Sequence, residues 1–181
     1  GEAFDFVVLA SDAIDKLITS GHIDAHSKTD LVHSGVAVAV RSGADHPDIS
    51  TEDALRQAVQ SARSLSYSTG PSGVALARLF ERWGITNEIK SRIVQAPPGV
   101  PVGALVARGD VELGFQQLSE LIHIEGIDLL GPLPAAVQIT TTFTAGLCPG
   151  SNQAAAVRGL LDFMASPAAA EAKQRQGMEP A

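Results

Sequence analysis

The residues best suited to binding chemistry lie in one short stretch, Tyr67-Ser68-Thr69-Gly70-Pro71-Ser72-Gly73. The stretch follows a short alternating run that predicts a strand, and it precedes an apolar pattern of helical period. The first N–H groups of a helix have no intrahelical acceptors and point outward, where they attract negative charge. Together with the Ser and Thr hydroxyls, they predict a binding site for an anion.

Other predicted strands deliver similar neutral groups at their carboxyl ends, which is where open α/β sheets bind ligands. The candidates from this pattern and from the stretch above are Ser11, Ser68, Thr69, Gly70, Ser72, Gly73, Val102, Gln116 and Gln117. Hydroxyls, amides and free N–H groups bind an anion without cations, and each hydrogen bond contributes about 1 kcal/mol or somewhat more. The serines are also good helix N-caps and the glycines suit turns, so each of them has a purely structural alternative.

Motifs for catalysis are few. The segment 69–73 lacks the Gly-Lys-Ser/Thr ending of a phosphate loop and does not match the Gly-x-Ser-x-Gly nucleophile elbow. The five histidines have no metal-ligand spacing, and Cys148 has neither a helix start nor a basic neighbour, so we expect structural or surface roles, no metal and no cofactor. Asp12 and Glu120 follow predicted ligand loops, and each is either a general base or simply an acid in the first turn of a helix.

The composition restricts the class of protein. The chain has 181 residues, of which 45% are hydrophobic and 18% charged, so it is long enough to fold around a core as one domain or two small lobes. Thirteen Lys and Arg against twenty Asp and Glu give a net charge of −7, and no basic cluster is interleaved with aromatic residues. Nucleic acid is therefore excluded as a partner. Membrane insertion is excluded as well, because no apolar run reaches about 20 residues.

The elements that must position the candidate residues alternate between strands and helices, which predicts an α/β fold with mostly parallel sheets. Two β-rich runs, near 31–41 and 139–145, bracket a central block with its own strands and helices. We therefore expect two lobes: a discontinuous first lobe of residues 1–36 and 137–181, and a second lobe of residues 37–136, joined by these crossing strands. The run 4–10 is typical of a strand buried on both faces, so we expect the first lobe to be incomplete in this chain.

Five segments in order carry a family resemblance: 5–11 (DFVVLAS), 67–74 (YSTGPSGV), 105–117 (LVARGDVELGFQQ), 131–134 (GPLP) and 161–170 (LDFMASPAAA). They resemble the molybdate-binding-protein-like branch of type 2 periplasmic solute-binding proteins over nearly the whole chain. The resemblance implies two lobes closing on an anion, with Ser11 in the first lobe and the helix start at 68–73 and Val102 in the second. It also implies a periplasmic location and an ABC-type membrane permease as a partner. The opening strand of the family, with another binding serine, and the helix after it are absent here.

The sequence departs from that branch at Gln116 and Gln117, where molybdate binders usually carry a tyrosine-containing loop. Two amides there favour a larger anion, such as a carboxylate, over molybdate. The leading hypothesis is thus an extracytoplasmic solute-binding protein for a small anion. The alternative is an enzyme similar to aconitate isomerase, which moves a proton within a tricarboxylate, with Asp12, Glu120 or a nearby His as the base. The effector lobe of a transcriptional regulator, which shares this fold, is a third hypothesis.

Overall fold

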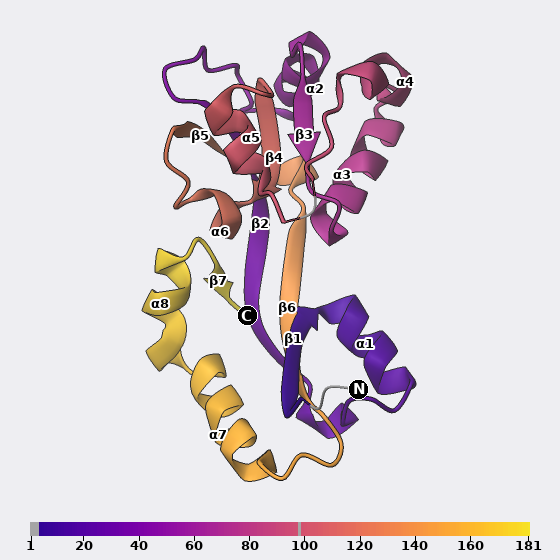
Figure 1. Cartoon of the computed structure of the whole chain (residues 1–181), viewed down its shortest axis with the longest axis vertical. Helices are drawn as coiled ribbons and strands as arrows, with labels where there is room; N and C mark the ends of the chain where they lie inside the picture. Colours follow the sequence, from indigo (N-terminus) through magenta and orange to yellow (C-terminus); the bar gives the residue numbers. More distant parts are fainter. Residues whose placement is uncertain (1–3, 98) are drawn as a thin grey trace. The chain divides into compact units, whose positions relative to one another are not determined.

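The computed structural model describes residues 4–97 and 99–181, so residues 1–3 of the predicted first lobe and residue 98 of the second lie outside it. Contacts divide the chain into two compact units: unit 1 comprises Gly1–Ser34 and Thr141–Ala181, and unit 2 comprises Gly35–Thr140. The β-rich run near 31–41 forms one strand, β2 (Thr29–Arg41), which has residues in both units (Figure 1). None of the described helices is long and apolar enough to cross a membrane.

Unit 1 is built on strands β1 and β6 and the first residues of β2. Its elements are β1 (Phe6–Ala10), α1 (Ser11–Thr19), η1 (Ala25–Ser27), β6 (Thr140–Leu147, whose first residue belongs to unit 2), α7 (Ala154–Ala165), η4 (Pro167–Ala169), α8 (Ala170–Arg175) and β7 (Glu179–Pro180). Strand β1 runs antiparallel to β6, and β7 pairs with β2 at Val32 and His33. The apolar core of the unit lies between α7 and these strands and comprises Leu31, Val32, Ala145, Leu147, Val157 and Leu161.

The prediction that residues 4–10 are buried on both faces is wrong for the structure as described. Val8 and Leu9 are each 39% exposed, and Phe4 is 58% exposed. Among the described residues β1 pairs only with β6, so one of its edges carries no neighbouring strand that could shield these side chains.

Unit 2 contains a four-stranded sheet in the order β5-β2-β4-β3. Its elements are the remainder of β2, α2 (Glu52–Ser61), β3 (Leu65–Tyr67), α3 (Pro71–Arg82), α4 (Thr86–Ile89), η2 (Lys90–Arg92), α5 (Val102–Arg108), β4 (Leu113–Gln117), α6 (Leu118–Leu121), β5 (Ile127–Pro132) and η3 (Ala135–Val137). Strands β3 and β4 are parallel, and the crossover that a parallel pair needs contains α3, α4, η2 and α5. Strand β2 is antiparallel to both β4 and β5. The α/β class is confirmed, but the sheets are mixed rather than mostly parallel.

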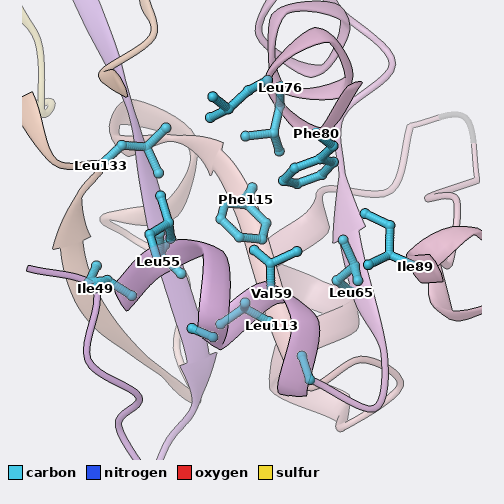
Figure 2. Packing of buried hydrophobic residues seen from close by; sticks show 14 of the residues in the cluster. Ile49, Leu55, Val59, Leu65, Leu76, Phe80, Ile89, Leu113, Phe115 and Leu133 are labelled. Carbon is cyan, nitrogen blue, oxygen red and sulfur yellow. The ribbon is translucent and has the colours of Figure 1, made fainter. Parts of the chain in front are cut away.

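Every residue of β4 is buried, because this strand lies between β2 and β3 and is covered on its two faces. Figure 2 shows Phe115 of β4 at the centre of the core, between Phe80 of α3 and Val59 of α2. The Phe115 and Phe80 rings meet edge to face, with 6.1 Å between their centroids. This packing fixes the position of α3 against the end of β4.

The helix starts differ from the predictions. Ser11 and Ser72 are not N-caps: α1 is capped by Ala10, and α3 by Gly70 with Pro71 at its first position. Proline at the first helical position has its φ already set for a helix and lacks the N–H that would otherwise go unpaired, which explains why α3 begins before Ser72. Both serines therefore lie within the first turn of their helices.

Candidate functional site

The candidate site is built on the carboxyl edge of unit 2, which we define as the ends of the parallel strands β3 and β4. Tyr67 of β3 is aligned with Phe115 of β4, so Ser68 and Gln116 follow at the same level. All the residues predicted for the site lie in unit 2 except Ser11, which is half-buried at the start of α1 in unit 1. The fold of unit 2 thus brings the remaining candidates to one end of its sheet.

The first turn of α3 lies directly against the end of β3, and Gly73 makes this possible. A Cβ atom at position 73 would lie 1.6 Å from the carbonyl oxygen of Ser68, a distance at which atoms overlap. By contrast, a Cβ at Gly70 would meet only the Ser68 hydroxyl, at 3.9 Å. Position 73 therefore requires glycine so that the helix start, with its outward N–H groups, can close onto the strand end.

Two hydroxyl groups lie together at this helix start. The Oγ atoms of Ser68 and Ser72 are 3.1 Å apart and share one hydrogen bond. Ser72 is buried and Ser68 half-buried, whereas Thr69 is exposed. Because one hydroxyl donates to the other, the second O–H of the pair remains able to donate to a ligand. The first turn of α3 contains no acidic residue, so nothing there opposes an anion.

Tyr67 and Gln95 support this edge, and Gln95 was not among the residues predicted for the site. The Tyr67 ring packs edge to face on Phe80, with 5.8 Å between centroids, and burial raises the pKa of its phenol, which therefore stays protonated at neutral pH. The side-chain amide of Gln95 donates to the Tyr67 carbonyl at 3.3 Å. The weak strand pattern at 93–95 was the available signal, since Ile93 forms a parallel bridge with Leu65.

The sequence predicted Gln116 as a ligand contact, but in the structure its side-chain amide is hydrogen-bonded within the protein. Its Oε1 accepts from the backbone N–H of Gly103 at 3.4 Å, and its Nε2 donates to Oε2 of Glu120. Each end of the amide thus makes one hydrogen bond within the protein, which fixes its orientation, and the side chain is buried. The partner of the Gln116 amide, Glu120, is an exposed residue of α6. Because Gln116 is in a strand and Glu120 in the following helix, the i,i+4 pairing of helices does not predict this contact.

Gln117 and Val102 contribute in other ways. Side chains alternate along a strand, so Gln117 shares the face of Phe115 and lies opposite Gln116. Gln117 is buried, at 4% exposure. Val102 is the first residue of α5, and its side chain packs in a small apolar cluster with Val106. Gly114 allows this packing, because a Cβ there would lie 2.4 Å from a Val106 methyl. Only the backbone of Val102 is therefore suited to contact a ligand.

One buried hydroxyl close to the edge was missed by sequence reasoning. Ser66 of β3 is fully buried, and its Oγ has no hydrogen-bond partner among the described residues. It pairs in register with Gly114, on the strand face opposite to that of Tyr67. The alternating pattern of 64–68 indicated a polar residue on that face but gave no sign that the face is covered.

The other candidates occupy different environments. Asp12 is exposed and 3.5 Å from Lys16 of its own helix. His46 lies 3.2 Å from Asp128, whose pKa is lowered mainly by the N–H of Gly43 and also by the Ser42 hydroxyl and His46. Burial raises the pKa of the Cys148 thiol, with a smaller contribution from a nearby carboxylate. Within 4–97 and 99–181, no group of three His, Cys, Asp or Glu residues could hold a metal ion.

Comparisons with known proteins extend over the whole chain. A family model described as bacterial extracellular solute-binding protein matches residues 1–179. An aconitate isomerase from Pseudomonas sp is 42% identical over 182 residues, a match that covers 99% of this chain and 68% of that protein. Similar solved structures include the substrate-binding domain of a molybdenum ABC transporter from Clostridium difficile, with a TM-score of 0.79 at 14% identity over all of this chain and 79% of that one. The periplasmic molybdate-binding protein of Azotobacter vinelandii has a TM-score of 0.75 at 19% identity over 98% of this chain and 79% of its own. At these identities the two structures establish a shared fold.

Proposed function

Because the chain belongs to the family of bacterial extracellular solute-binding proteins, we propose that it captures a small organic anion. In this proposal the ligand contacts the Ser68 and Ser72 hydroxyls and the first N–H groups of α3. Capture takes place in the periplasm, and the loaded protein delivers the ligand to an ABC-type membrane permease.

The observation that carries the proposal is the close packing of the first turn of α3 against the end of β3. Gly73 lets the helix start approach the Ser68 carbonyl, so the helix dipole and two hydroxyls converge on one place. The first turn offers these donors without an acidic side chain. Neutral donors of this kind hold an anion through hydrogen bonds that are stronger because the acceptor is charged. Gln117 and the backbone at the start of α5 are further proposed contacts.

Isothermal titration calorimetry on the whole chain tests the binding proposal. We expect saturable binding of a tricarboxylate such as cis-aconitate or citrate, and weaker binding of sulfate and molybdate. The physical reason is that an extended carboxylate can reach several neutral donors at once, whereas a small tetrahedral anion meets fewer of them. Absence of saturable binding of both tricarboxylates would contradict the proposal.

A second candidate function is proton transfer within a tricarboxylate. It is favoured by the 42% identity to an aconitate isomerase over 99% of this chain. Solvent deuterium exchange into cis- and trans-aconitate, followed by NMR, separates the two functions. Binding with no exchange leaves a pure binding protein, whereas exchange with interconversion of the isomers identifies an enzyme.

A further inference from the structure

We propose that Glu120 is the base that removes and returns the proton in this second candidate function, and that Gln116 is the residue that positions it. The inference rests on that candidate and names the groups that would act at the carboxyl edge of unit 2. It starts from the contact between the Gln116 amide and the Glu120 carboxylate, which joins the end of β4 to α6.

The position of the Glu120 carboxylate is fixed through Gln116. Gln116 lies in the central strand of unit 2 and is 7% exposed. Its Oε1 accepts from the Gly103 N–H at the start of α5, so its Nε2 is held in one direction, toward Oε2 of Glu120. Leu121, the next residue of α6, is fully buried and anchors the short helix from the other side. The second carboxylate oxygen of Glu120 remains available at the exposed surface.

Asp12, His33 and His46 each have a different partner. The Asp12 side chain is 69% exposed, and its carboxylate is paired with Lys16 one turn along α1. His46, on the loop after β2, contacts Asp128 of β5. A ring nitrogen of His33 lies 3.0 Å from the Thr142 hydroxyl. Glu120 has no ion-pair partner within the described residues. No cationic side chain of the described residues therefore neutralises this carboxylate.

The charge of Glu120 also points to a chemical role. Glu120 follows the end of β4 at the carboxyl edge of unit 2, so its charge would repel an anionic ligand bound there, and a site that only binds anions gains nothing from it. A base must nevertheless lie within hydrogen-bond reach of the proton that it removes. The two requirements meet in a ligand that carries both carboxylates and an acidic C–H bond.

The proton transfer balances without a cofactor. One carboxylate oxygen of Glu120 takes a proton from the methylene carbon of the tricarboxylate, and the C–H electron pair spreads over the allylic carbons and the adjoining carboxylates. The same proton, or one exchanged with water, then returns from Glu120 to the other end of the allylic system, and the double bond moves. Neutral donors at the start of α3 would stabilise the charge that develops on the substrate carboxylates.

Substitution of Glu120→Gln tests the assignment, because it keeps the size of the side chain and a carbonyl acceptor for Gln116. We expect deuterium exchange into cis-aconitate to fall by roughly 100-fold or more, in line with the usual contribution of a general base. Citrate affinity by calorimetry should weaken less than about threefold, or improve, because one repelling charge is removed. Glu125→Gln is the matched control, since Glu125 is an exposed acid of the following loop, and it should change neither quantity.

The outcomes separate the two levels of the inference. Full exchange activity in Glu120→Gln overturns Glu120 as the base, and so does a wild-type protein that binds citrate without exchange, although the binding function then stands. A wild-type protein that binds no tricarboxylate overturns both. A circular-dichroism melt of each variant shows whether it is folded, and Glu120→Asp, which keeps the carboxylate on a shorter stem, should retain part of the activity.

The positioning role of Gln116 has a separate test in a double-mutant cycle. Gln116→Met keeps the length of the side chain and removes both hydrogen bonds, so kcat should fall about tenfold or more with little change in KM. In the Glu120→Gln background the same change should lower kcat no further, because Gln116 acts through Glu120. Additive losses would show that Gln116 has a merely structural role and would overturn this part of the proposal.

Discussion

At the residue scale, the candidate site depends on one missing Cβ. Gly73 and Gly70 both belong to the Ser-Gly-rich turn, and the sequence gives them the same structural alternative, turn geometry. The structure separates them: a side chain at position 73 would overlap the Ser68 carbonyl, whereas position 70 has room and a φ of −76°, which any residue adopts. The close approach of helix to strand is a tertiary contact, and no local pattern distinguishes the two glycines.

Substitution at these two positions gives a matched pair. Gly73→Ala should force the start of α3 away from β3 and destabilise the fold by about 1–3 kcal/mol, the usual cost of overpacking. Anion affinity should fall at least tenfold, because the helix N–H groups and the Ser68–Ser72 hydroxyl pair move apart. Gly70→Ala should change both quantities little. Thermal melts and calorimetric titrations measure the effects, and equal losses in the two variants would contradict this account of the site.

At the element scale, α2 and the end of α3 are tied together by one carboxylate. Oε1 of Glu52, in the first turn of α2, accepts from the indole N–H of Trp83 at 2.7 Å and from the Arg82 guanidinium at 3.1 Å. These donors, the Trp83 N–H first, lower the pKa of Glu52. The helical periods of the two segments predict both helices, but the tie connects residues 31 positions apart and belongs to their packing.

The hydrogen bonds of the Glu52 carboxylate make part of the protein's stability dependent on pH. A carboxyl whose pKa is lowered by folding stabilises the protein above its unfolded pKa, and this stabilisation is lost as the pH falls through the folded value. Glu52→Gln should therefore lower the melting temperature at pH 7, and the difference from wild type should shrink toward pH 3. Asp53→Asn is the matched control, because it removes a charge from the same helix turn and leaves the contact between Glu52 and Trp83 in place. Trp83 is the only tryptophan of the sequence, so its fluorescence follows the thermal unfolding of each variant.

At the scale of the whole molecule, the two units have very different cores. The core of unit 2 extends from Val36 to Val137 and includes the aromatic group around Phe80, Trp83 and Phe115. The core of unit 1 is much smaller and contains no aromatic residue among its fully buried members, although Phe6 and Phe143 pack at its margin. Since stability follows the apolar area that is buried, we expect unit 1 to be the less stable of the two.

The substitution Leu161→Ala tests the expected difference in stability between the two units. Leu161 of α7 is 3% exposed in the unit 1 core, and its truncation should cost about 2–5 kcal/mol of local stability. Far-UV circular dichroism should show an earlier loss of part of the helical signal, while the Trp83 fluorescence transition of unit 2 stays near its wild-type midpoint. Hydrogen exchange of the β6 amides provides an independent measure. Coincident shifts of both transitions would show instead that the units unfold as one.

The sequence by itself determined the α/β class, the family resemblance and the alternation of elements, and it predicted the segments 67–73 and 116–117 as site candidates. These are local properties, since hydrophobic period, glycine and proline punctuation and polar residues after strands are all read within a few neighbouring positions. The cap of α3 differs from the prediction, because Gly70 rather than Ser72 caps the helix and Pro71 occupies its first position.

Only the tertiary structure decided how these residues are used. It turned Gln116 from a predicted ligand contact into a buried link between Gly103 and Glu120, and it showed that strand directions in unit 2 are mixed. The physical reason is the same in each case. Which strands pair, which amide is already bonded and which glycine must lack a Cβ are set by contacts between segments far apart in the chain, and such contacts leave no periodic signal in the sequence.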